Sequence, residues 1–325
     1  MKRLTRLIFV AVIAILSLSC EDSLNPYGSL DERYVLNCVI RGDSTFQVAT
    51  LTKSYMVTNS NPYSDKEDQG IKGATIRLWN GNDKVAFLHD TTISEPEGSL
   101  YDRPYSAYYT NQFQPKDNST VQIEAILPNG KKLTSSAKVP SRISIFPGST
   151  TDQIPPKSGN DIFIKWISDQ KNPVFIIRLA IYYFKYENGQ KKRGIYTIPL
   201  NYVKFNDGYI PIYPKPQSES AYVLSMETID KAMELISKGD DDKSRYEILS
   251  CIAEVLSLNE ELSFYYNGTA RSGDIYSVKL DETDYSNIEN GSGLFGVYMR
   301  TYSLLRFKHD YIKSFGYTPG LTDVK

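Results

Sequence analysis

The chain has 325 residues, with 37 basic against 38 acidic side chains and a formal net charge of −1. At about 150 residues per domain, this length allows two domains that each bury a core. No long basic run follows residue 6, so the sequence does not support a surface for nucleic acid. Tyrosine is abundant (25 residues), and a Tyr-rich chain punctuated by Gly and Pro favours strands and turns.

The N-terminus is typical of a secretory signal. Lys2, Arg3 and Arg6 precede an apolar run over residues 7–18, which is too short to cross a hydrocarbon layer of about 30 Å as a helix. We therefore predict a signal peptide over residues 1–19. The alternative is a buried cysteine inside a plain signal peptide or a short membrane anchor.

Residues 16–22 resemble a bacterial lipobox. The resemblance implies cleavage between Ser19 and Cys20 and transfer of a diacylglycerol to the Cys20 thiol. Ser17 stands where the pattern prefers Leu, a looseness that is common in Bacteroidota lipoproteins. Two or three acyl chains on one residue would anchor the chain stably in a membrane.

The residues after the cysteine are polar. Glu21 and Asp22 are similar to the acidic surface-export signal of that phylum, in a short form. Residues 20–32 carry Pro, Gly and Ser without periodicity, which predicts a lipidated tether.

Residues 33–142 are predicted to form an Ig-like or transthyretin-like β-sandwich. Short runs of alternating apolar residues are separated by turn residues, the clearest turn being Pro-Asn-Gly at 128–130. The predicted strands cover residues 34–40, 46–52, 74–79, 85–88, 105–109, 121–127 and 133–139.

Residues 143–325 are predicted to form a second β-rich domain, similar to a fibronectin-III sandwich and carrying one or two short helices. Its strands start with residues 162–166 and a long run over 175–183, and the last one covers residues 294–307. Residues 226–238 break the β pattern with apolar side chains at helical spacing, an N-terminal Ser225 and a C-terminal Gly239.

Two neighbouring segments need a choice. Residues 247–256 fit a helix or a strand, and we predict a strand. Ser257 and Glu260 have the spacing of a capping box, which predicts a short helix that ends near Tyr266. Cys38 and Cys251 each lie in an apolar run, so we predict two buried free thiols, with a disulfide as the alternative.

Several short runs together resemble a known family. They are Gly-Ala-Thr-Ile at 73–76, Pro-Asn-Gly-Lys at 128–131, Val-Pro at 139–140, and the most specific run, residues 286–296. With the lipidated cysteine, they resemble a family of Bacteroidota outer-membrane lipoproteins that carries only a domain-of-unknown-function name. Members are often encoded beside TonB-dependent outer-membrane transporters, which implies an accessory surface lipoprotein without a known activity. The Asn and Gly residues of 286–296 also predict tight turns and close backbone approach before a strand.

No motif of a cofactor-dependent, metal-dependent or nucleophilic enzyme is present in the sequence. Arg-Gly-Asp-Ser at 41–44 matches an integrin-binding tripeptide, and we interpret it as a hairpin turn. The acidic run at 239–244 lacks the ligand spacing of an EF-hand, so we interpret it as a solvated loop. His89 and His309 are far apart, and a glycosidase with two distant carboxylates stays an alternative.

Three tyrosine clusters could stack on sugars or line a protein interface, but ordinary strand packing is favoured. They are Tyr105, Tyr108 and Tyr109; Tyr182, Tyr183 and Tyr186; and Tyr265 and Tyr266.

The sequence thus predicts a non-catalytic, lipid-anchored outer-membrane protein, without cofactor or metal, that binds a partner such as a TonB-dependent transporter. A structural or adhesive surface protein and a glycan or peptide hydrolase are the alternatives.

Overall fold

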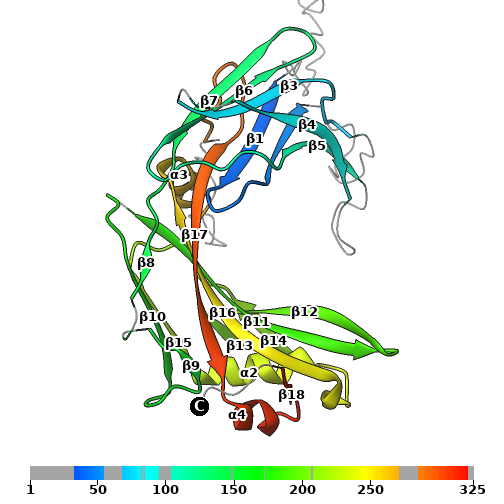
Figure 1. Cartoon of the computed structure of the whole chain (residues 1–325), viewed down its shortest axis with the longest axis vertical. Helices are drawn as coiled ribbons and strands as arrows, with labels where there is room; N and C mark the ends of the chain where they lie inside the picture. The colour runs from blue at the N-terminus through cyan, green and yellow to red at the C-terminus, as the bar shows by residue number, and fades with distance from the viewer. Residues whose placement is uncertain are drawn as a thin grey trace, which may run out of the picture.

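The computed structural model shows a mostly β protein, as the sequence predicts, bent into two halves that curve toward each other on one side (Figure 1). The structure describes residues 33–54, 68–94, 104–270 and 285–320, apart from residues 82, 84, 147, 149, 172, 206 and 207. The predicted signal peptide, Ser19, Cys20, Glu21, Asp22 and the tether lie outside the described residues. Among the described residues, no helix has the length and hydropathy needed to cross a membrane.

In the described residues of the first half, seven strands form a sheet with a buried face. They are β1 (Tyr34–Arg41), β2 (Gln47–Lys53), β3 (Thr75–Asn80), β4 (Ala86–Ile93), β5 (Tyr105–Thr110), β6 (Thr120–Ile126) and β7 (Lys132–Lys138). Their order across the sheet is β1-β2-β5-β4-β3-β6-β7. Alternate residues such as Leu36, Cys38 and Ile40 are fully buried, because successive strand side chains point to opposite faces.

The second half is built on three long strands. They are β11 (Val174–Glu187), β16 (Tyr246–Leu258) and β17 (Phe295–Phe307), with β12 (Gln190–Ile198) at the edge of the sheet. The shorter strands are β8 (Ser144–Ile145), β9 (Gln153–Ile154), β10 (Asp161–Ile167), β13 (Asn201–Phe205), β14 (Gly208–Ile212), β15 (Ala221–Ser225) and β18 (Thr318–Pro319). The helices are α2 (Met226–Ile236), the 3-10 turn η2 (Lys243–Arg245), α3 (Glu260–Ala270) and α4 (His309–Ser314).

One strand, β17, joins the two halves into a single sheet. Its first part pairs in parallel with β1, where Cys38 lies opposite Phe295. Its remaining length pairs antiparallel with β16, from Tyr298 opposite Leu258 to Leu305 opposite Cys251. Figure 1 shows this strand running from beside β1 in the first half to the far end of the second half, near α4.

Each half has its own hydrophobic core, and β17 contributes to both. Leu305 and Phe307 belong to the core of the second half, whereas Phe295, Val297 and Met299 belong to the core of the first. The predicted division into residues 33–142 and 143–325, like the predicted type of each sandwich, stays a prediction. The structure adds that the first core takes four side chains from the C-terminal part of the chain, Ile288 and the three from β17.

The predicted strand over residues 247–256 is confirmed by β16, and the predicted helix over 226–238 by α2. Ser225 caps α2, because its hydroxyl accepts a hydrogen bond from the Glu227 amide at 3.1 Å. The prediction of a capping box for the next helix is wrong, because Ser257 lies inside β16, opposite Met299. Its hydroxyl accepts a hydrogen bond from the Gln170 side chain. Asn259 caps α3 instead, accepting from the Leu262 amide at 3.2 Å.

Cys38 and Cys251 are buried free thiols, as predicted. They lie in the two different cores. Burial raises the pKa of each thiol to about 12, which keeps both protonated and unreactive at neutral pH.

Candidate functional site

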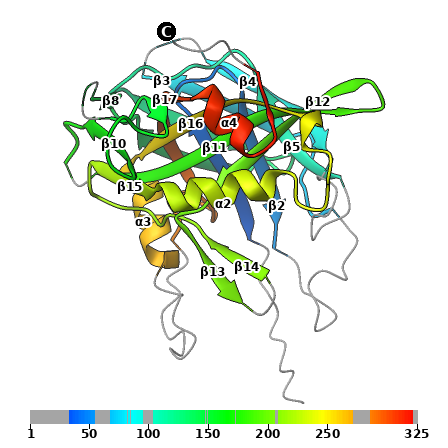
Figure 2. The same ribbon diagram turned by 90° about the horizontal axis from the view of Figure 1, so that it is seen from below.

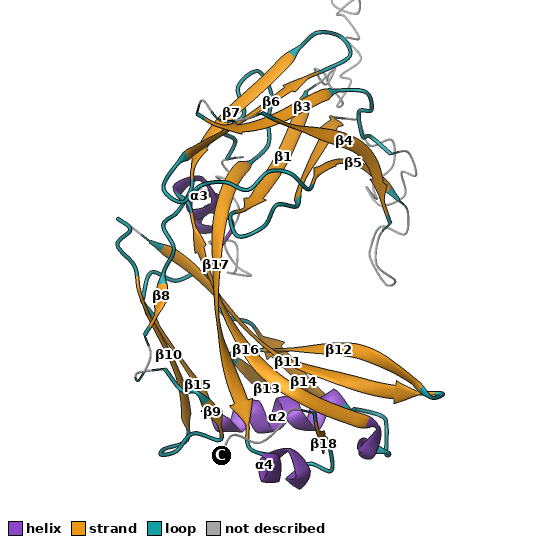
Figure 3. Ribbon diagram, in the orientation of Figure 1, coloured by secondary structure: helices purple, strands orange, loops and turns teal. Residues whose placement is uncertain are grey.

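The long sheet of the second half has one covered face and one open face. Phe175, Ile177, Leu179 and Ile181 of β11 point into the core. Helices α2 and α4 lie over this covered side, as the view from below shows (Figure 2). We call the opposite side of β12, β11, β16 and β17 the inner face, because it is turned toward the first half of the molecule (Figure 3).

Large apolar and aromatic side chains are exposed on the inner face. Tyr302 is 64% exposed, Ile195 53% and Leu304 40%, and Ile252 is half-buried beside them. The strand register aligns Thr197, Ala180, Ile252 and Leu304 in one row across the four strands. Cross-strand neighbours on one face of a sheet contact each other, so these side chains form a continuous uncharged row.

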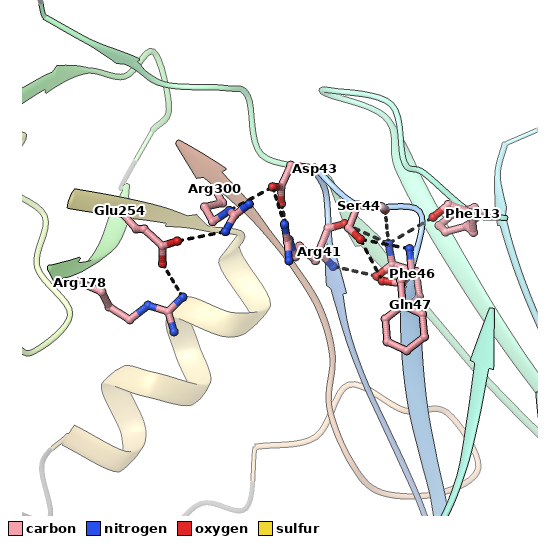
Figure 4. A network of polar contacts seen from close by, with 9 residues as sticks. All are labelled: Arg41, Asp43, Ser44, Phe46, Gln47, Phe113, Arg178, Glu254 and Arg300. Carbon is pink, nitrogen blue, oxygen red and sulfur yellow. Dashed lines mark hydrogen bonds and ion pairs between the residues drawn. The ribbon is translucent and has the colours of Figure 1, made fainter. Parts of the chain in front are cut away.

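A chain of alternating charges lies next to this row (Figure 4). Arg178 contacts Glu254 at 2.8 Å, and Glu254 contacts Arg300 at 3.0 Å. Arg300 then contacts Asp43 at 3.1 Å, and Asp43 contacts Arg41 at 2.8 Å. The five side chains come from β11, β16, β17, β1 and the turn after β1, so they connect the two halves of the molecule.

Both carboxylates of this series of ion pairs are largely buried. Only 13% of the Glu254 side chain and 15% of the Asp43 side chain are exposed. Burial works against the charged form of Asp43, but hydrogen bonds and charges from Arg41 and Arg300 outweigh it. The pKa of Asp43 is therefore lowered from its usual value. The hydrogen bond with Asp43 in turn raises the pKa of Arg41.

The Arg-Gly-Asp-Ser tetrapeptide ends β1 at Arg41 and starts the turn toward β2, so the turn interpretation is confirmed. The Gln47 side-chain amide holds this turn by donating to the carbonyl oxygens of Arg41, Ser44 and Phe113 (Figure 4). The Arg41 guanidinium donates two hydrogen bonds to Asp43. An integrin-type contact would need both side chains free, so the internal pair supports the turn interpretation.

The acidic run at 239–244 is tied to the neighbouring strands. Asp240 accepts hydrogen bonds from Tyr246 at 2.9 Å and Arg245 at 2.5 Å, and Lys185 lies at 3.4 Å. The hydrogen bond from Tyr246, together with that from Arg245, lowers the pKa of Asp240 to about 2. Within the described ranges, no three His, Cys, Asp or Glu side chains are placed to hold a metal ion.

The tyrosine clusters divide between packing and the inner face. Tyr108 is buried, and its hydroxyl donates to the Ile71 carbonyl and accepts from the Ala74 amide. Tyr183 packs on Tyr246 in the second core. By alternation along β11, Tyr182 lies on the inner face, and the Arg193 guanidinium lies 5.1 Å from the centre of its ring.

His89 lies in β4 and His309 in α4, in opposite halves of the molecule. The structure therefore does not bring the two histidines together in a common site.

The run over residues 286–296 attaches the C-terminal part of the chain to β1. The Asn287 side chain donates to the Phe295 carbonyl and accepts from the Phe295 amide, at 2.7 and 2.8 Å. Gly293 has φ +120°, and a Cβ there would come within 2.1 Å of the Leu36 carbonyl oxygen. The predicted close backbone approach before a strand is confirmed, and it explains why glycine is needed at this position.

The model of a family described as "Domain of unknown function (DUF4249)" matches residues 24–302. The chain belongs to this family. The match covers the first half, the run over residues 286–296, and β11, β12 and β16 of the inner face, and it ends within β17. No curated protein matches the sequence.

Some solved structures show a weak likeness to the DUF4249 chain. The C-terminal globular domain of an oligosaccharyltransferase from Pyrococcus abyssi is 12% identical, with 68% of this chain and 47% of that chain covered and a TM-score of 0.23. The chicken CNTN1 FN1-FN3 domains are 12% identical, with 83% and 65% covered and a TM-score of 0.15. The complex of Dpr11 IG1 with DIP-gamma IG+IG2 is 9% identical, with 86% and 100% covered and a TM-score of 0.17.

The DUF4249 chain thus spans about half the length of the first of these structures. TM-scores of this size carry no information on function.

Sequence reasoning missed the inner face of the DUF4249 chain. Arg178, Glu254 and Arg300 each lie between apolar, aromatic or small residues of a long strand. A charged residue at a position that alternates with apolar ones was the available signal of an open face. The short strands β8, β9 and β15 and the β13–β14 hairpin were also missed, because each has at most five residues.

Proposed function

We propose that this protein is a non-catalytic, lipid-anchored component of the outer membrane that binds a partner protein through its inner face. The partner that we propose is a TonB-dependent outer-membrane transporter, beside which the protein acts as an accessory subunit. The observation that carries the proposal is the open inner face of a long sheet, with Tyr302 and Leu304 exposed on β17 and Ile195 exposed on the edge strand β12.

The composition of this face supports protein binding. Interface cores are enriched in Tyr and Arg, and the residues that dominate binding energy are drawn from the same types. The face combines Tyr302 with Arg178 and Arg300, whose guanidiniums are already held by Glu254. A face that is held in place before binding loses less conformational freedom when a partner docks.

The lipid anchor rests on the N-terminal sequence. A positive start, a short apolar run and Cys20 at its end support export and acylation. Replacing Cys20 by Ser should release the protein from the membrane fraction and abolish labelling by a fatty-acid analogue. A protein that is labelled and retained without Cys20 would contradict this part of the proposal.

The binding role is tested by purifying the native protein from outer membranes through a C-terminal tag, followed by mass spectrometry. We expect a TonB-dependent transporter in stoichiometric amount, and its loss in the Tyr302→Ala/Leu304→Ala variant. Phe163→Ala/Val223→Ala is the matched control, because these two side chains are comparably exposed on β10 and β15, away from the inner face. Recovery of the wild-type protein alone would contradict the accessory role.

A further inference from the structure

The inner face has a charge opposite in sign to that of the whole chain, which carries −1. Alternation along the strands and the cross-strand register place five basic and two acidic side chains on it. They are Arg178, Lys191, Arg193, Arg300 and Arg306, with Glu247 and Glu254. The excess of three positive charges lies on one side of one sheet.

The two carboxylates are already occupied. Glu254 contacts Arg178 and Arg300, and Glu247 accepts from the Tyr186 hydroxyl at 2.6 Å and contacts Lys191 at 3.0 Å. These contacts leave two guanidiniums on the face without a carboxylate, counting only the described part of the chain.

The two remaining arginines are Arg193 and Arg306. Arg193 lies over the Tyr182 ring on the β12 side. Arg306 is the next residue after Leu304 on the same face of β17. The uncharged row with Ile252 and Leu304 crosses the sheet beside them. A ligand that spans the four strands would therefore meet a cation at either side and apolar side chains between the two.

The exposed aliphatic side chains decide which kind of anion fits. A polysaccharide needs hydroxyl-binding polar groups, whereas the row presents aliphatic carbon atoms of Ile252 and Leu304, with Ile195 nearby. A protein segment, unlike a polysaccharide, can present carboxylates next to apolar or aromatic side chains. Its binding would combine ion pairs with the arginines and burial of apolar side chains against the uncharged row.

We infer that the inner face binds a segment of the partner protein in which carboxylates accompany apolar or aromatic side chains. This inference rests on the proposed function and specifies the chemistry of the partner. Carboxylates of the segment form ion pairs with Arg193 and Arg306, and its apolar side chains pack on Tyr302, Leu304 and Ile252.

The inference is tested with polymers of defined composition and the full-length protein in detergent. The probes are fluorescent poly(Glu,Tyr), poly(Glu) and poly(Lys,Tyr), with heparin as the competing anionic polysaccharide. We expect poly(Glu,Tyr) to bind at least about tenfold more tightly than poly(Glu), which corresponds to about 1.4 kcal/mol, and poly(Lys,Tyr) not to bind. Equal affinities for poly(Glu,Tyr) and poly(Glu) would overturn the inference.

Two variants separate the charged from the apolar contribution. Arg193→Glu/Arg306→Glu should weaken poly(Glu,Tyr) binding at least about tenfold. Lys165→Glu/Lys204→Glu, an equal charge change on β10 and β13, should leave it unchanged. Tyr302→Ser/Leu304→Ser should weaken binding of poly(Glu,Tyr) but not of poly(Glu). An equal loss of poly(Glu,Tyr) affinity in the Lys165→Glu/Lys204→Glu control would overturn the inference. Heparin binding that is lost in the arginine variant but unchanged in Tyr302→Ser/Leu304→Ser would also overturn it.

Native purification distinguishes this inference from the proposed function. If the transporter is recovered equally with wild type and with Arg193→Glu/Arg306→Glu, the inference is wrong and the accessory role stands. If poly(Glu,Tyr) binds as expected but no transporter is recovered, the chemistry of the face is supported and the accessory role is wrong.

Discussion

The two faces of β11 differ in chemistry although they alternate along the same backbone. Phe175, Ile177, Leu179 and Ile181 are at most 1% exposed and fill the second core. Arg178, one position from Ile177, is 53% exposed and carries a charge. The covered face must be apolar because packing stabilises the fold, whereas the composition of the inner face is free to serve binding. Mutations on the two faces should therefore have different consequences.

The largest effect is expected on the covered face. The Phe175 ring packs edge-on against Trp166, with ring centres 5.2 Å apart. Replacing Phe175 by Ala should lower the free energy of unfolding by about 3–5 kcal/mol, because a buried aromatic side chain leaves a cavity. Chemical denaturation measures this change. A loss below about 1 kcal/mol would contradict the assignment of this face to the core.

A smaller effect is expected for the charged chain on the inner face. Replacing Glu254 by Ala leaves Arg178 and Arg300 without their shared carboxylate. Because these guanidiniums are partly exposed, the expected loss of unfolding free energy is about 1–2 kcal/mol. The double variant Arg178→Ala/Glu254→Ala should recover part of this lost free energy of unfolding. Additive losses would show that the two side chains do not interact.

Acid should weaken the ion pairs of Asp43 with Arg41 and Arg300. Its pKa is lowered in the folded protein, so the unfolded chain binds protons more readily at low pH. The stabilisation by the ionised Asp43 carboxylate is complete above about pH 4, the usual pKa of Asp. It is lost as the pH falls through the lowered pKa of the folded protein. Unfolding measured at pH 7 and pH 3 should show a smaller decrease for Asp43→Asn than for wild type. Equal decreases would assign the acid sensitivity to other groups.

The smallest effect on stability is expected for the exposed side chains of the inner face. Tyr302→Ala should change the free energy of unfolding by no more than about 0.5 kcal/mol, because the ring is already in water. The same variant is expected to lose partner binding. A strong destabilisation without loss of binding would reverse the roles that we assign to the two faces.

Much of the fold follows from local patterns in the sequence. The alternation along residues 175–183 identifies the covered face of β11, and Ser225 marks the start of α2. The helix ends at Ile236, two residues before the predicted end, and Gly239 lies in the turn that follows. The capping box at Ser257 failed because pairing with β17 keeps this residue in an extended strand. Local hydrogen-bonding preference is outweighed there by a long-range ladder.

The inner face could not be predicted in this way. Glu254 lies 76 residues from Arg178, and Asp43 lies 257 residues from Arg300. Such neighbours depend on strand order and register, which alternation within one strand does not contain. The proposed lipid anchor is the reverse case, since its prediction rests on residues 1–22 alone and not on the fold.

The position of β17 also determines when the molecule can fold. β1 is among the first strands to leave a ribosome or a translocation channel, and its neighbour Leu294 follows 257 residues after Asn37. The core of the first half lacks Phe295, Val297 and Met299 until that segment arrives, and contacts of such high sequence separation form slowly. A chaperone that shields residues 34–139 during this interval would protect the chain from aggregation, and truncation before residue 295 would damage the half of the molecule farthest away along the sequence.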